Sequence, residues 1–315
     1  MKAVKMSDTL HTTTMLFVSV VIPTRDRNEQ LSLCLDRLKP GFQSLGAADY
    51  EVIVSDDGRE STAQDMMRDR YPWARWVAGP RRGPAANRNN GARHARGAWI
   101  VLTDDDCLPE PGWLAAYVAA VRPDVQVLEG RTTCQAGIHS PLHHAPINLT
   151  GGWLWSCNIA VRRSTYEELG GFDEEYPYTH MEDVDFRERL GDAGIRFEYV
   201  LEATVDHPPR RLPRGRELAA AQESYIIYCR KRGMKIGLLS LLWIVIQARL
   251  RTLIRYPFSR DTLVAAVSLV EELLVLSWRF SKWKRRHIAP LRLQACKASA
   301  TSASLEAAGP ATTTR

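Results

Sequence analysis

Residues 97–106 read Gly-Ala-Trp-Ile-Val-Leu-Thr-Asp-Asp-Asp, an apolar run that ends in three consecutive carboxylates. A continuous run of apolar side chains is typical of a strand that is buried on both faces of a parallel sheet. In open α/β sheets, ligands bind outside the carboxyl ends of the strands. The stretch therefore predicts a strand over residues 98–103 with a functional acidic group directly after it.

The same pattern extends toward the N-terminus. Val18–Pro23 and Glu51–Ser55 are further apolar runs, and each is followed by polar residues at its carboxyl end. Between them, the apolar residues of Arg27–Leu38 recur at the spacing of one helix face. Ser61–Arg70 then predicts a helix and Trp76–Ala78 a short strand. This alternation indicates an α/β fold with a mostly parallel central sheet flanked by helices.

The composition is that of a globular protein with one large domain or two modest ones. The 315 residues are 45% hydrophobic and 25% charged, which excludes collagen-like, low-complexity and wholly disordered classes. The six cysteines are scattered without a Cys-x-x-Cys pair, and the apolar run that ends at Pro23 is not followed by a cleavage site. We therefore expect reduced thiols and a cytoplasmic location.

The acidic cluster Asp104–Asp106 has two interpretations. Oxygen-rich clusters suit Mg²⁺ or Mn²⁺, which bridge to the phosphates of a substrate, whereas the alternative is an acidic loop that stays solvated. Another group of metal-ligating residue types contains Cys134, His139, His143 and His144. Their spacing is not that of zinc ligands, so we expect a mobile loop there.

A second acidic cluster, Glu182-Asp183-Val184-Asp185, stands where a helix is expected to begin. The helix dipole favours acids in a first turn, so simple capping would explain them. A carboxylate that points into a cleft from the start of a helix is also well placed to act as a general base.

Arginines form a third candidate group, because Arg81, Arg82 and Arg88 follow or lie within a Gly- and Pro-rich segment. Guanidinium groups pair with phosphate through two hydrogen bonds, and the alternative is a solvated basic loop. The 315 residues contain neither a Gly-x-Gly-x-x-Gly fingerprint nor a P-loop sequence, which argues against both of those nucleotide sites.

In their order along the chain, these segments resemble the family 2 glycosyltransferases of the GT-A fold over roughly residues 16–207. The resemblance rests on Val18-Ser-Val-Val-Ile-Pro-Thr-Arg25, Val52-Ile-Val-Ser-Asp-Asp-Gly58, Gly83-Pro-Ala-Ala-Asn-Arg-Asn-Asn-Gly91, Gly97-Ala-Trp-Ile-Val-Leu-Thr-Asp-Asp-Asp106, Asn158-Ile-Ala-Val-Arg-Arg163, Gly170-Gly-Phe-Asp-Glu174 and Glu182-Asp-Val-Asp185. It implies an inverting transferase that moves a sugar from a nucleotide-diphosphate donor to an acceptor hydroxyl.

The resemblance also implies a role for each matching position. The donor would be held by Pro23, Thr24, Arg25, Asp56, Asp57, Arg82, Arg88, Asp104 and Asp105. The metal ligands would come from Asp104, Asp105, Asp106 and His207. The catalytic base would be Asp183.

The implied cofactor is Mg²⁺ or Mn²⁺, and the implied donor is a UDP-, dTDP- or GDP-sugar. The acceptor would be a glycan, a lipid-linked sugar or a secondary metabolite. The bulky stretch 153–158 departs from the small residues common in the family and indicates an unusual pocket. The Gln-x-x-Arg-Trp motif of processive polysaccharide synthases is absent, which favours a transferase that adds a single sugar.

Two other functions compete with this interpretation. A sugar-phosphate nucleotidyltransferase would also combine an α/β sheet, a nucleotide and a divalent ion, but it would carry a Gly-rich loop after the first strand. Here that place reads Pro23-Thr-Arg-Asp-Arg27. A membrane-associated adaptor with a degenerate catalytic domain is the second alternative, and the intact carboxylates at 104–106 and 183 argue against it.

Charge divides the chain into regions. The net charge of +6 is uneven, because residues 1–229 hold 26 Lys and Arg against 32 Asp and Glu, whereas residues 230–292 hold 14 against 3. We expect a flexible extension over 1–15, a GT-A domain over 16–229 with halves at 16–110 and 111–229, a basic amphipathic helical extension over 230–292, and a disordered tail over 293–315.

The helical extension predicts an anionic partner. Neither of its uncharged runs reaches the length of about 20 residues that spans a bilayer. Residues 278–287 interleave aromatic and cationic side chains, a pattern that suits stacked single-stranded bases or a membrane surface. Beside a glycosyltransferase domain we favour peripheral attachment to the inner face of the cell membrane and expect no nucleic acid. The alternative is packing on the catalytic domain with a solvated basic face.

Overall fold

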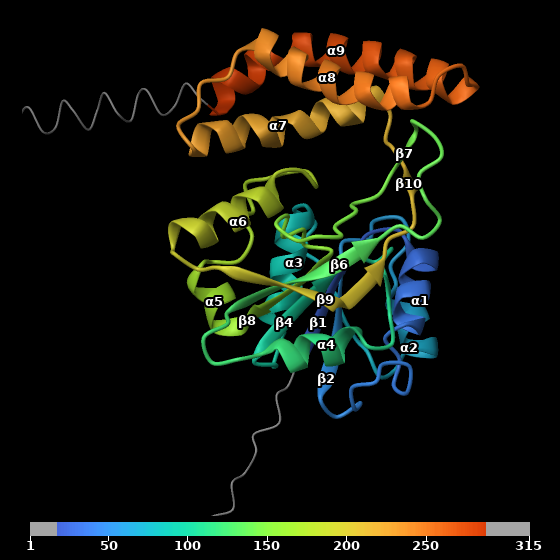
Figure 1. Cartoon of the computed structure of the whole chain (residues 1–315), viewed down its shortest axis with the longest axis vertical. Helices are drawn as coiled ribbons and strands as arrows, with labels where there is room; N and C mark the ends of the chain where they lie inside the picture. The colour runs from blue at the N-terminus through green and yellow to red at the C-terminus, as the bar shows by residue number, and fades with distance from the viewer. Residues whose placement is uncertain (1–17, 288–315) are drawn as a thin grey trace, which may run out of the picture.

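The computed structural model describes residues 18–287, and Figure 1 shows its path. The N-terminal extension predicted over 1–15 and the tail predicted over 293–315 lie outside the described residues. An α/β region holds the strands, and a layer of three long helices lies against one side of it (Figure 1).

The α/β region alternates strands and helices, as the sequence predicts. Its strands are β1 (Val18–Thr24), β2 (Tyr50–Asp56), β3 (Arg75–Ala78), β4 (Trp99–Thr103), β5 (Leu108–Pro109), β6 (Val127–Thr133), β7 (His143–His144), β8 (Asn158–Arg162), β9 (Phe197–Asp206) and β10 (Arg210–Arg211). Its helices are α1 (Asn28–Asp36), α2 (Gln64–Arg70), α3 (Pro84–Arg93), α4 (Trp113–Ala120), α5 (Arg163–Glu168) and α6 (Glu182–Asp192).

One sheet of eight strands forms the centre of this region, in the order β3-β2-β1-β4-β8-β6-β9-β5. Strands β3, β2, β1 and β4 run parallel to one another, and β6 pairs in parallel with β9. Strand β8 is antiparallel to both β4 and β6, and β5 is antiparallel to β9. The N-terminal half of the sheet is thus parallel and the C-terminal half is mixed, which confirms a mostly parallel α/β sheet.

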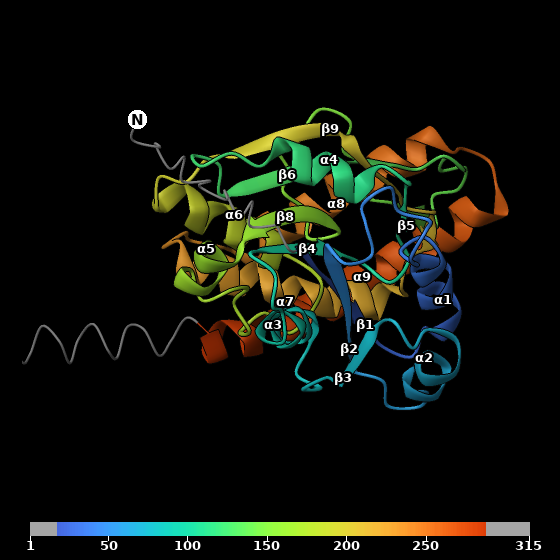
Figure 2. The same ribbon diagram turned by 90° about the horizontal axis from the view of Figure 1, so that it is seen from below.

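Helices cover both faces of the sheet and bury a separate apolar layer on each. On one face, Leu31 and Leu35 of α1 and Trp113 of α4 pack with apolar residues of β1, β2 and β4. On the other face, Ala85 of α3 and Phe186 of α6 pack against the opposite side chains of these strands. Figure 2 shows α1 and α2 on one side of β1–β3 and α3 on the other.

The parallel register brings the polar residues after the strands to one edge of the sheet. Thr24 at the end of β1 lies opposite Asp56 at the end of β2, and β4 continues directly into Asp104. The segments that the sequence singled out therefore meet at the place where α/β sheets bind ligands.

The remaining helices form a module of their own, the helical module of residues 215–287. It contains α7 (Gly215–Lys231), α8 (Leu238–Arg255) and α9 (Arg260–His287). Ile226 of α7, Leu241 of α8 and Leu276 of α9 belong to one buried apolar cluster. In Figure 1, α7 lies between the α/β region and the pair formed by α8 and α9.

The predicted helical extension over 230–292 therefore has an additional member in α7. Because α7 begins at Gly215 and shares its apolar cluster with α9, we propose that the domain boundary lies before Gly215 rather than between 229 and 230. Lys231 joins the module to the α/β region, with its Nζ atom 2.5 Å from Asp173 and 2.8 Å from Glu175. Within residues 18–287, every helix is too short or too polar to cross a membrane.

Candidate active site

A cleft of about 280 Å³, the first cleft, opens at the carboxyl edge of the parallel strands. Many of the residues predicted to bind a donor line it, namely Pro23, Thr24, Arg25, Asp57, Arg88, Asp104 and Asp105. Its far wall comes from Pro177, Tyr178 and Thr179, which precede α6.

A second cleft of about 320 Å³ adjoins the first. Trp155, Ser156 and Cys157 line it from the stretch before β8, and Glu182 and Asp183 line it from the start of α6. Both clefts share the four wall residues Arg88, Asp104, Thr179 and Arg210. The two acidic clusters of the sequence therefore belong to one continuous site.

Arg88 connects these two acidic clusters. Its Nη2 atom lies 2.8 Å from Oδ1 of Asp104, and its Nη1 atom lies 3.2 Å from Oε1 of Glu182. Burial disfavours the charged guanidinium, but the carboxylates of Asp104, Asp183 and Glu182 outweigh this cost and raise the pKa of Arg88. Arg88, which we predicted to lie near the donor phosphates, thus contacts one acid of each cluster, Asp104 and Glu182.

The other acids of the 104–106 cluster also have cationic partners. Arg27 lies between them, with Nη1 2.8 Å from Oδ1 of Asp105 and Nη2 2.5 Å from Oδ2 of Asp106. Thr24 donates a hydrogen bond of 2.8 Å to Asp105. Burial raises the pKa of Asp105 to about 7, although Arg27 opposes the shift.

Asp183 is placed in the first turn of α6, which Met181 precedes with a left-handed φ of 75°. Such a φ is uncommon for a residue other than glycine, and strained residues of this kind cluster at functional sites. Within the described part of the chain, Oδ1 of Asp183 is buried without a hydrogen-bond partner. Burial raises the pKa of Asp183, and burial together with the charge of Asp183 raises the pKa of Glu182 to about 8. A raised pKa is the property that a buried general base needs.

The two aspartates at the carboxyl end of β2 make different contacts. The carboxylate of Asp56 accepts hydrogen bonds from the backbone N–H of Gly58 and Ala63 and from the indole of Trp76, so it fixes the loop after β2. Asp57 lines the first cleft and accepts a hydrogen bond of 2.7 Å from the backbone N–H of Arg81. Asp57 is therefore the member of the pair that a ligand in the cleft meets.

Two arginines that were predicted to bind the donor, Arg25 and Arg82, lie nearer the protein surface than Arg88 does. Arg25 lines the first cleft but is largely exposed, with its Nε atom 3.6 Å from Asp26. Arg82 lines neither cleft, and its Nη2 atom lies 2.7 Å from Glu174. Of the two arginines proposed to lie near base or phosphates, Arg88 reaches the clefts in this conformation.

His207 lies beside the acidic cluster, at the end of β9. Its Nδ1–H donates to the carbonyl of Pro208 at 2.9 Å, and its Nε2 atom lies 3.2 Å from Oδ1 of Asp106. Burial disfavours the imidazolium, but the Asp106 carboxylate outweighs it and raises the pKa of His207 to about 9. The same contact, with Arg27, holds the pKa of Asp106 below its usual range despite burial.

Asp106, Cys107 and His207 form a group whose ligand atoms lie within 4.8 Å of one another. A carboxylate with an imidazole suits Mn²⁺ or a related ion. Burial raises the pKa of the Cys107 thiol well above its usual value, so the thiol stays protonated and is a poor ligand for a hard ion. The donor set of Asp106 and His207 thus fits the implied cation, with Asp104 and Asp105 nearby.

The histidine-rich loop has more structure than we expected. His143 and His144 form β7, which pairs with β10 through Arg211 and Arg210. His144 lines the second cleft, and burial together with Arg210 lowers its pKa to about 4. The prediction of a loop is wrong for these two residues, which form a short strand. The sequence pattern did not indicate the strand because its pairing with 210–211 is a long-range contact.

Sequence reasoning missed two site residues. Arg27 was visible in the stretch Pro23-Thr-Arg-Asp-Arg27, where its place after the first strand could have indicated a partner for the acids. Arg210 lies in both clefts, 3.8 Å from Asp106. Arg210 belongs to no sequence motif. It reaches the site because β10, which follows β9, pairs with β7.

Comparison with known proteins gives concordant matches. The family described as Glycosyl transferase family 2 matches residues 19–167. Glycosyltransferase AglE of Haloferax volcanii is 25% identical over 215 residues, which cover 63% of this chain and 69% of the relative. Pre-mycofactocin glycosyltransferase of Mycobacterium tuberculosis is 32% identical over 220 residues, which cover 61% of this chain but 43% of the relative.

Among solved structures, TarS 1–349 of S. aureus superimposes with a TM-score of 0.52 at 15% identity, covering 82% of this chain and 71% of TarS. The same protein has been solved with UDP-GlcNAc, with a TM-score of 0.51 at 14% identity, covering 84% of this chain and 73% of that one. At this level of identity the likeness shows the fold.

Proposed function

The chain carries a glycosyltransferase family 2 domain on the GT-A fold, and from this premise we propose that it transfers a single sugar, with inversion, from a nucleotide-diphosphate donor to an acceptor hydroxyl. The observation that carries the proposal is the bridge made by Arg88, which contacts Asp104 in the first cleft and Glu182 beside Asp183 in the second. This bridge supports Asp183 as the base, because Asp183 follows Glu182 and lines the cleft that adjoins the one proposed for the donor.

The first cleft is the proposed donor site. Pro23, Thr24 and Asp57 line it and would hold the nucleoside. Arg27, Arg88 and Arg210 line it beside Asp104, and guanidinium groups suit the charge of a diphosphate. The complex of TarS with UDP-GlcNAc supports a nucleotide-sugar donor, and UDP-, dTDP- and GDP-sugars are the candidates to be tested.

Asp183 is the proposed catalytic base. It would remove the proton from the acceptor hydroxyl, whose oxygen forms a bond to the anomeric carbon while the bond from that carbon to the diphosphate oxygen breaks. The electron pair of the broken bond leaves with the nucleotide diphosphate, and arginines near Asp104 stabilise its charge. Because attack and departure are in line on one carbon, the anomeric configuration inverts.

Asp106 and His207 are the proposed ligands of Mg²⁺ or Mn²⁺, with Asp104 and Asp105 completing the acidic edge. When bound, the ion would neutralise negative charge on the donor diphosphate. The hydrogen bond from Nδ1 of His207 to Pro208 leaves Nε2 facing Asp106, the orientation that a metal-binding imidazole requires.

The helical module is the proposed membrane-binding part, which would place a cytoplasmic enzyme on the inner face of the cell membrane. Large apolar side chains are exposed along α8 and α9, among them Leu239, Trp243, Leu263, Val267 and Leu274. With the basic residues of the module they suit an interface with anionic lipid. A lipid-linked acceptor would be presented at such an interface, and a glycan acceptor is the alternative.

A donor screen tests this function. The full chain is heated with each nucleotide sugar in Mn²⁺, and a stabilising donor is then assayed for release of nucleotide diphosphate with and without EDTA. We expect one donor class to stabilise the protein and to be turned over only with metal. Formation of a nucleotide sugar from a nucleoside triphosphate and a sugar phosphate would support the nucleotidyltransferase instead, and the absence of binding and turnover with every donor would support the adaptor.

A further inference from the structure

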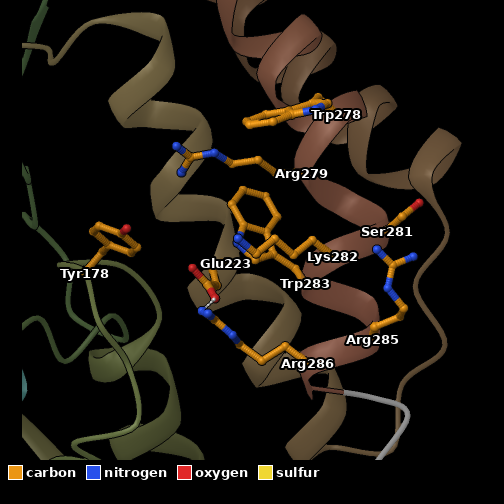
Figure 3. Close-up of a pocket in the computed structure, with 9 residues that line it drawn as sticks. All are labelled: Tyr178, Glu223, Trp278, Arg279, Ser281, Lys282, Trp283, Arg285 and Arg286. Carbon is orange, nitrogen blue, oxygen red and sulfur yellow. Dashed lines mark hydrogen bonds and ion pairs between the residues drawn. The ribbon is translucent and has the colours of Figure 1, made fainter.

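A third cleft of about 470 Å³, here called the helix cleft, lies where the C-terminal part of α9 faces the α/β region. Three aromatic side chains, Trp278, Trp283 and Tyr178, line it together with the cations Arg279, Lys282 and Arg285. Figure 3 shows Tyr178 on a loop of the α/β region, across from Arg279 and Trp283 of α9. This volume is in the range of small-molecule sites.

The charge of the helix cleft is strongly positive. Its single lining carboxylate, Glu223 of α7, is already engaged by Arg286 at 3.2 Å (Figure 3). The same carboxylate lies 2.8 Å from Nε2 of His287. Within residues 18–287, neither Lys282 nor Arg285 has an ion pair with a carboxylate. An anionic ligand would therefore find cations that the protein does not itself neutralise.

Arg279 gives the helix cleft a defined shape. Its guanidinium lies 6.0 Å from the ring centre of Trp278 and 6.0 Å from that of Trp283, so the two indoles flank it. Trp283 is buried and fixes one wall, whereas Trp278 is 78% exposed. A cation held between aromatic faces is preorganised to meet a phosphate, because few of its conformations remain to be lost.

An exposed apolar stripe leads to the helix cleft along α9. Leu263, Val267, Val270, Leu274 and Trp278 recur at steps of three or four residues, and each is more than half exposed. Side chains at this spacing lie on one face of a helix. The last member of the stripe, Trp278, is also a wall of the helix cleft. The apolar stripe of α9 thus continues into the cationic helix cleft.

The helix cleft also adjoins the proposed donor site. Tyr178 lines both the helix cleft and the first cleft, so the two clefts share a wall residue. A molecule whose charged group occupies the helix cleft therefore lies next to the proposed donor site. A site that only anchors the protein to a membrane does not have to lie near the donor site. A site that binds the acceptor does, because the acceptor hydroxyl must reach the donor sugar.

We propose that the helix cleft binds the phosphate of a lipid-linked acceptor, with the lipid chain lying along the apolar stripe of α9. This inference rests on the proposed function for the role of acceptor, whereas the binding of a lipid phosphate is a separate property of the cleft. The ligand class is an amphiphile with a long apolar chain and a phosphate or diphosphate head, and Lys282 and Arg285 are its specificity residues.

The test compares vesicle binding of the full chain. Phosphatidylcholine vesicles carry either a long-chain polyprenyl monophosphate or phosphatidylglycerol at matched charge. Lys282→Gln/Arg285→Gln is the cleft variant, and Arg251→Gln/Arg255→Gln removes the same charge from exposed positions of α8 outside the cleft. The measured quantity is the ratio of the two affinities, which cancels general attraction to an anionic surface.

The wild-type chain should prefer the polyprenyl phosphate by about tenfold or more, because direct charged hydrogen bonds exceed the general attraction of basic residues to anionic lipid. The cleft variant should lose this preference, and the α8 variant should bind both vesicles more weakly while keeping it. A preference that survives in the cleft variant overturns the proposal. So does a wild-type ratio near one.

Two further arms identify the ligand. If inorganic phosphate competes for the helix cleft as well as the lipid does, the cleft recognises the phosphate group alone. If a single-stranded oligonucleotide binds tightly to the wild type and not to the cleft variant, the cleft binds nucleic acid. Either result overturns the lipid-linked assignment. Titration with nucleotide sugars is run in parallel, so that failure of donor binding with an intact lipid preference refutes the proposed function and not the lipid site.

Discussion

Nη1 of Arg88 lies 3.2 Å from Oε1 of Glu182, and both side chains are buried at the junction of the two clefts. The same guanidinium contacts Asp104 through Nη2 at 2.8 Å. The Arg88 guanidinium therefore links Asp104, which follows β4, to Glu182, which begins α6. Arg88 and Glu182 are 94 positions apart in the chain.

Removing this cation should damage both stability and activity. Arg88→Gln leaves the Asp104 carboxylate without its charge partner and the buried Glu182 without a hydrogen-bond donor; removing one partner of a buried ion pair typically costs about 3–5 kcal/mol. Urea unfolding should report this loss, and turnover should fall with it. Arg82→Gln is the matched control, because Arg82 is exposed and its contact with Glu174 is a surface pair, worth about 1 kcal/mol or less. Equal losses in both variants would contradict the bridging role.

The base assignment predicts a separation of binding from turnover. Asp183→Asn should retain nucleotide-sugar affinity, because Asp183 lines the second cleft and not the first. Turnover should fall by about 10²–10⁴, the usual contribution of a general base. Calorimetric titration and a steady-state assay measure the two quantities. Asp192→Asn, at the exposed end of the same helix, should change neither, and a parallel loss of affinity and turnover in Asp183→Asn would count against the assignment.

The strand ends and the start of α6 were predictable because they are local. A continuous apolar run specifies a buried strand, and chain direction alone places Thr24, Asp57 and Asp104 at one edge of a parallel sheet. Sequence pattern does not decide which of Asp56 and Asp57 faces the ligand, since that depends on backbone donors at Gly58 and Ala63.

Other features depend on contacts between distant segments. Arg210 enters the site because β10 pairs with β7, and Tyr178 because its loop faces α9. Likewise, α7 belongs with the helical module because its buried residues contact α9, whereas its sequence alone continues from the α/β region without a break. Pairings of this kind have no local signal in the chain.

Glu182 should make stability depend on pH. Its pKa is raised to about 8 by burial and by the neighbouring Asp183, above the value of about 4.3 for an unfolded glutamate. Between these values the unfolded chain releases a proton that the folded chain retains. Stability should therefore fall as pH rises, by up to about 1.4 kcal/mol per pH unit for one proton.

Unfolding measured from pH 5 to 8 on the wild-type chain and on Glu182→Gln isolates this contribution. The glutamine variant removes the titrating group and keeps a hydrogen-bonding side chain of similar size. The difference in unfolding free energy between variant and wild type should grow with pH. Glu174→Gln, at a half-buried position near the surface, serves as the control. A difference that stays constant over this range would contradict the raised pKa.

Metal binding should depend on Asp106 and His207. EDTA should abolish transfer, and Mn²⁺ or Mg²⁺ should restore it. Mn²⁺ at about 100 times its dissociation constant should stabilise the EDTA-treated chain by about 2.7 kcal/mol, and His207→Ala should lose most of that stabilisation. Because the pKa of His207 is raised to about 9, the ion must displace a proton, so its affinity should weaken as pH falls.

Cys107→Ser distinguishes the two possible ligand sets. If the carboxylate and imidazole hold the ion, the serine variant keeps the Mn²⁺ stabilisation, since a protonated thiol contributes little to a hard cation. A loss in Cys107→Ser equal to that in His207→Ala would instead indicate a thiolate site, and Zn²⁺ would then replace Mn²⁺ as the expected ion.

The exposed stripe of α9 should control membrane attachment. Val267 and Leu274 are 69% and 67% exposed, so Val267→Gln/Leu274→Gln should leave thermal unfolding nearly unchanged. Burying a Val or Leu side chain stabilises by about 1.5–3 kcal/mol, so the double variant should bind anionic vesicles about 100-fold more weakly. Truncation near residue 230 is unsuitable, because it would uncover Ile226 of α7, which packs in the apolar cluster of the helical module.

Flotation of the full chain with vesicles of phosphatidylcholine and phosphatidylglycerol measures this effect. Leu33→Gln/Leu201→Gln is the matched control, since these leucines are 58% and 49% exposed on α1 and β9 of the α/β region. The control should float like the wild type. Raising the salt concentration should weaken the wild type and the control alike, because the basic residues of the module add a screened attraction to the apolar one. If the two double variants float equally well, the stripe does not contact lipid, and the alternative of helices that only pack on the catalytic domain is correct.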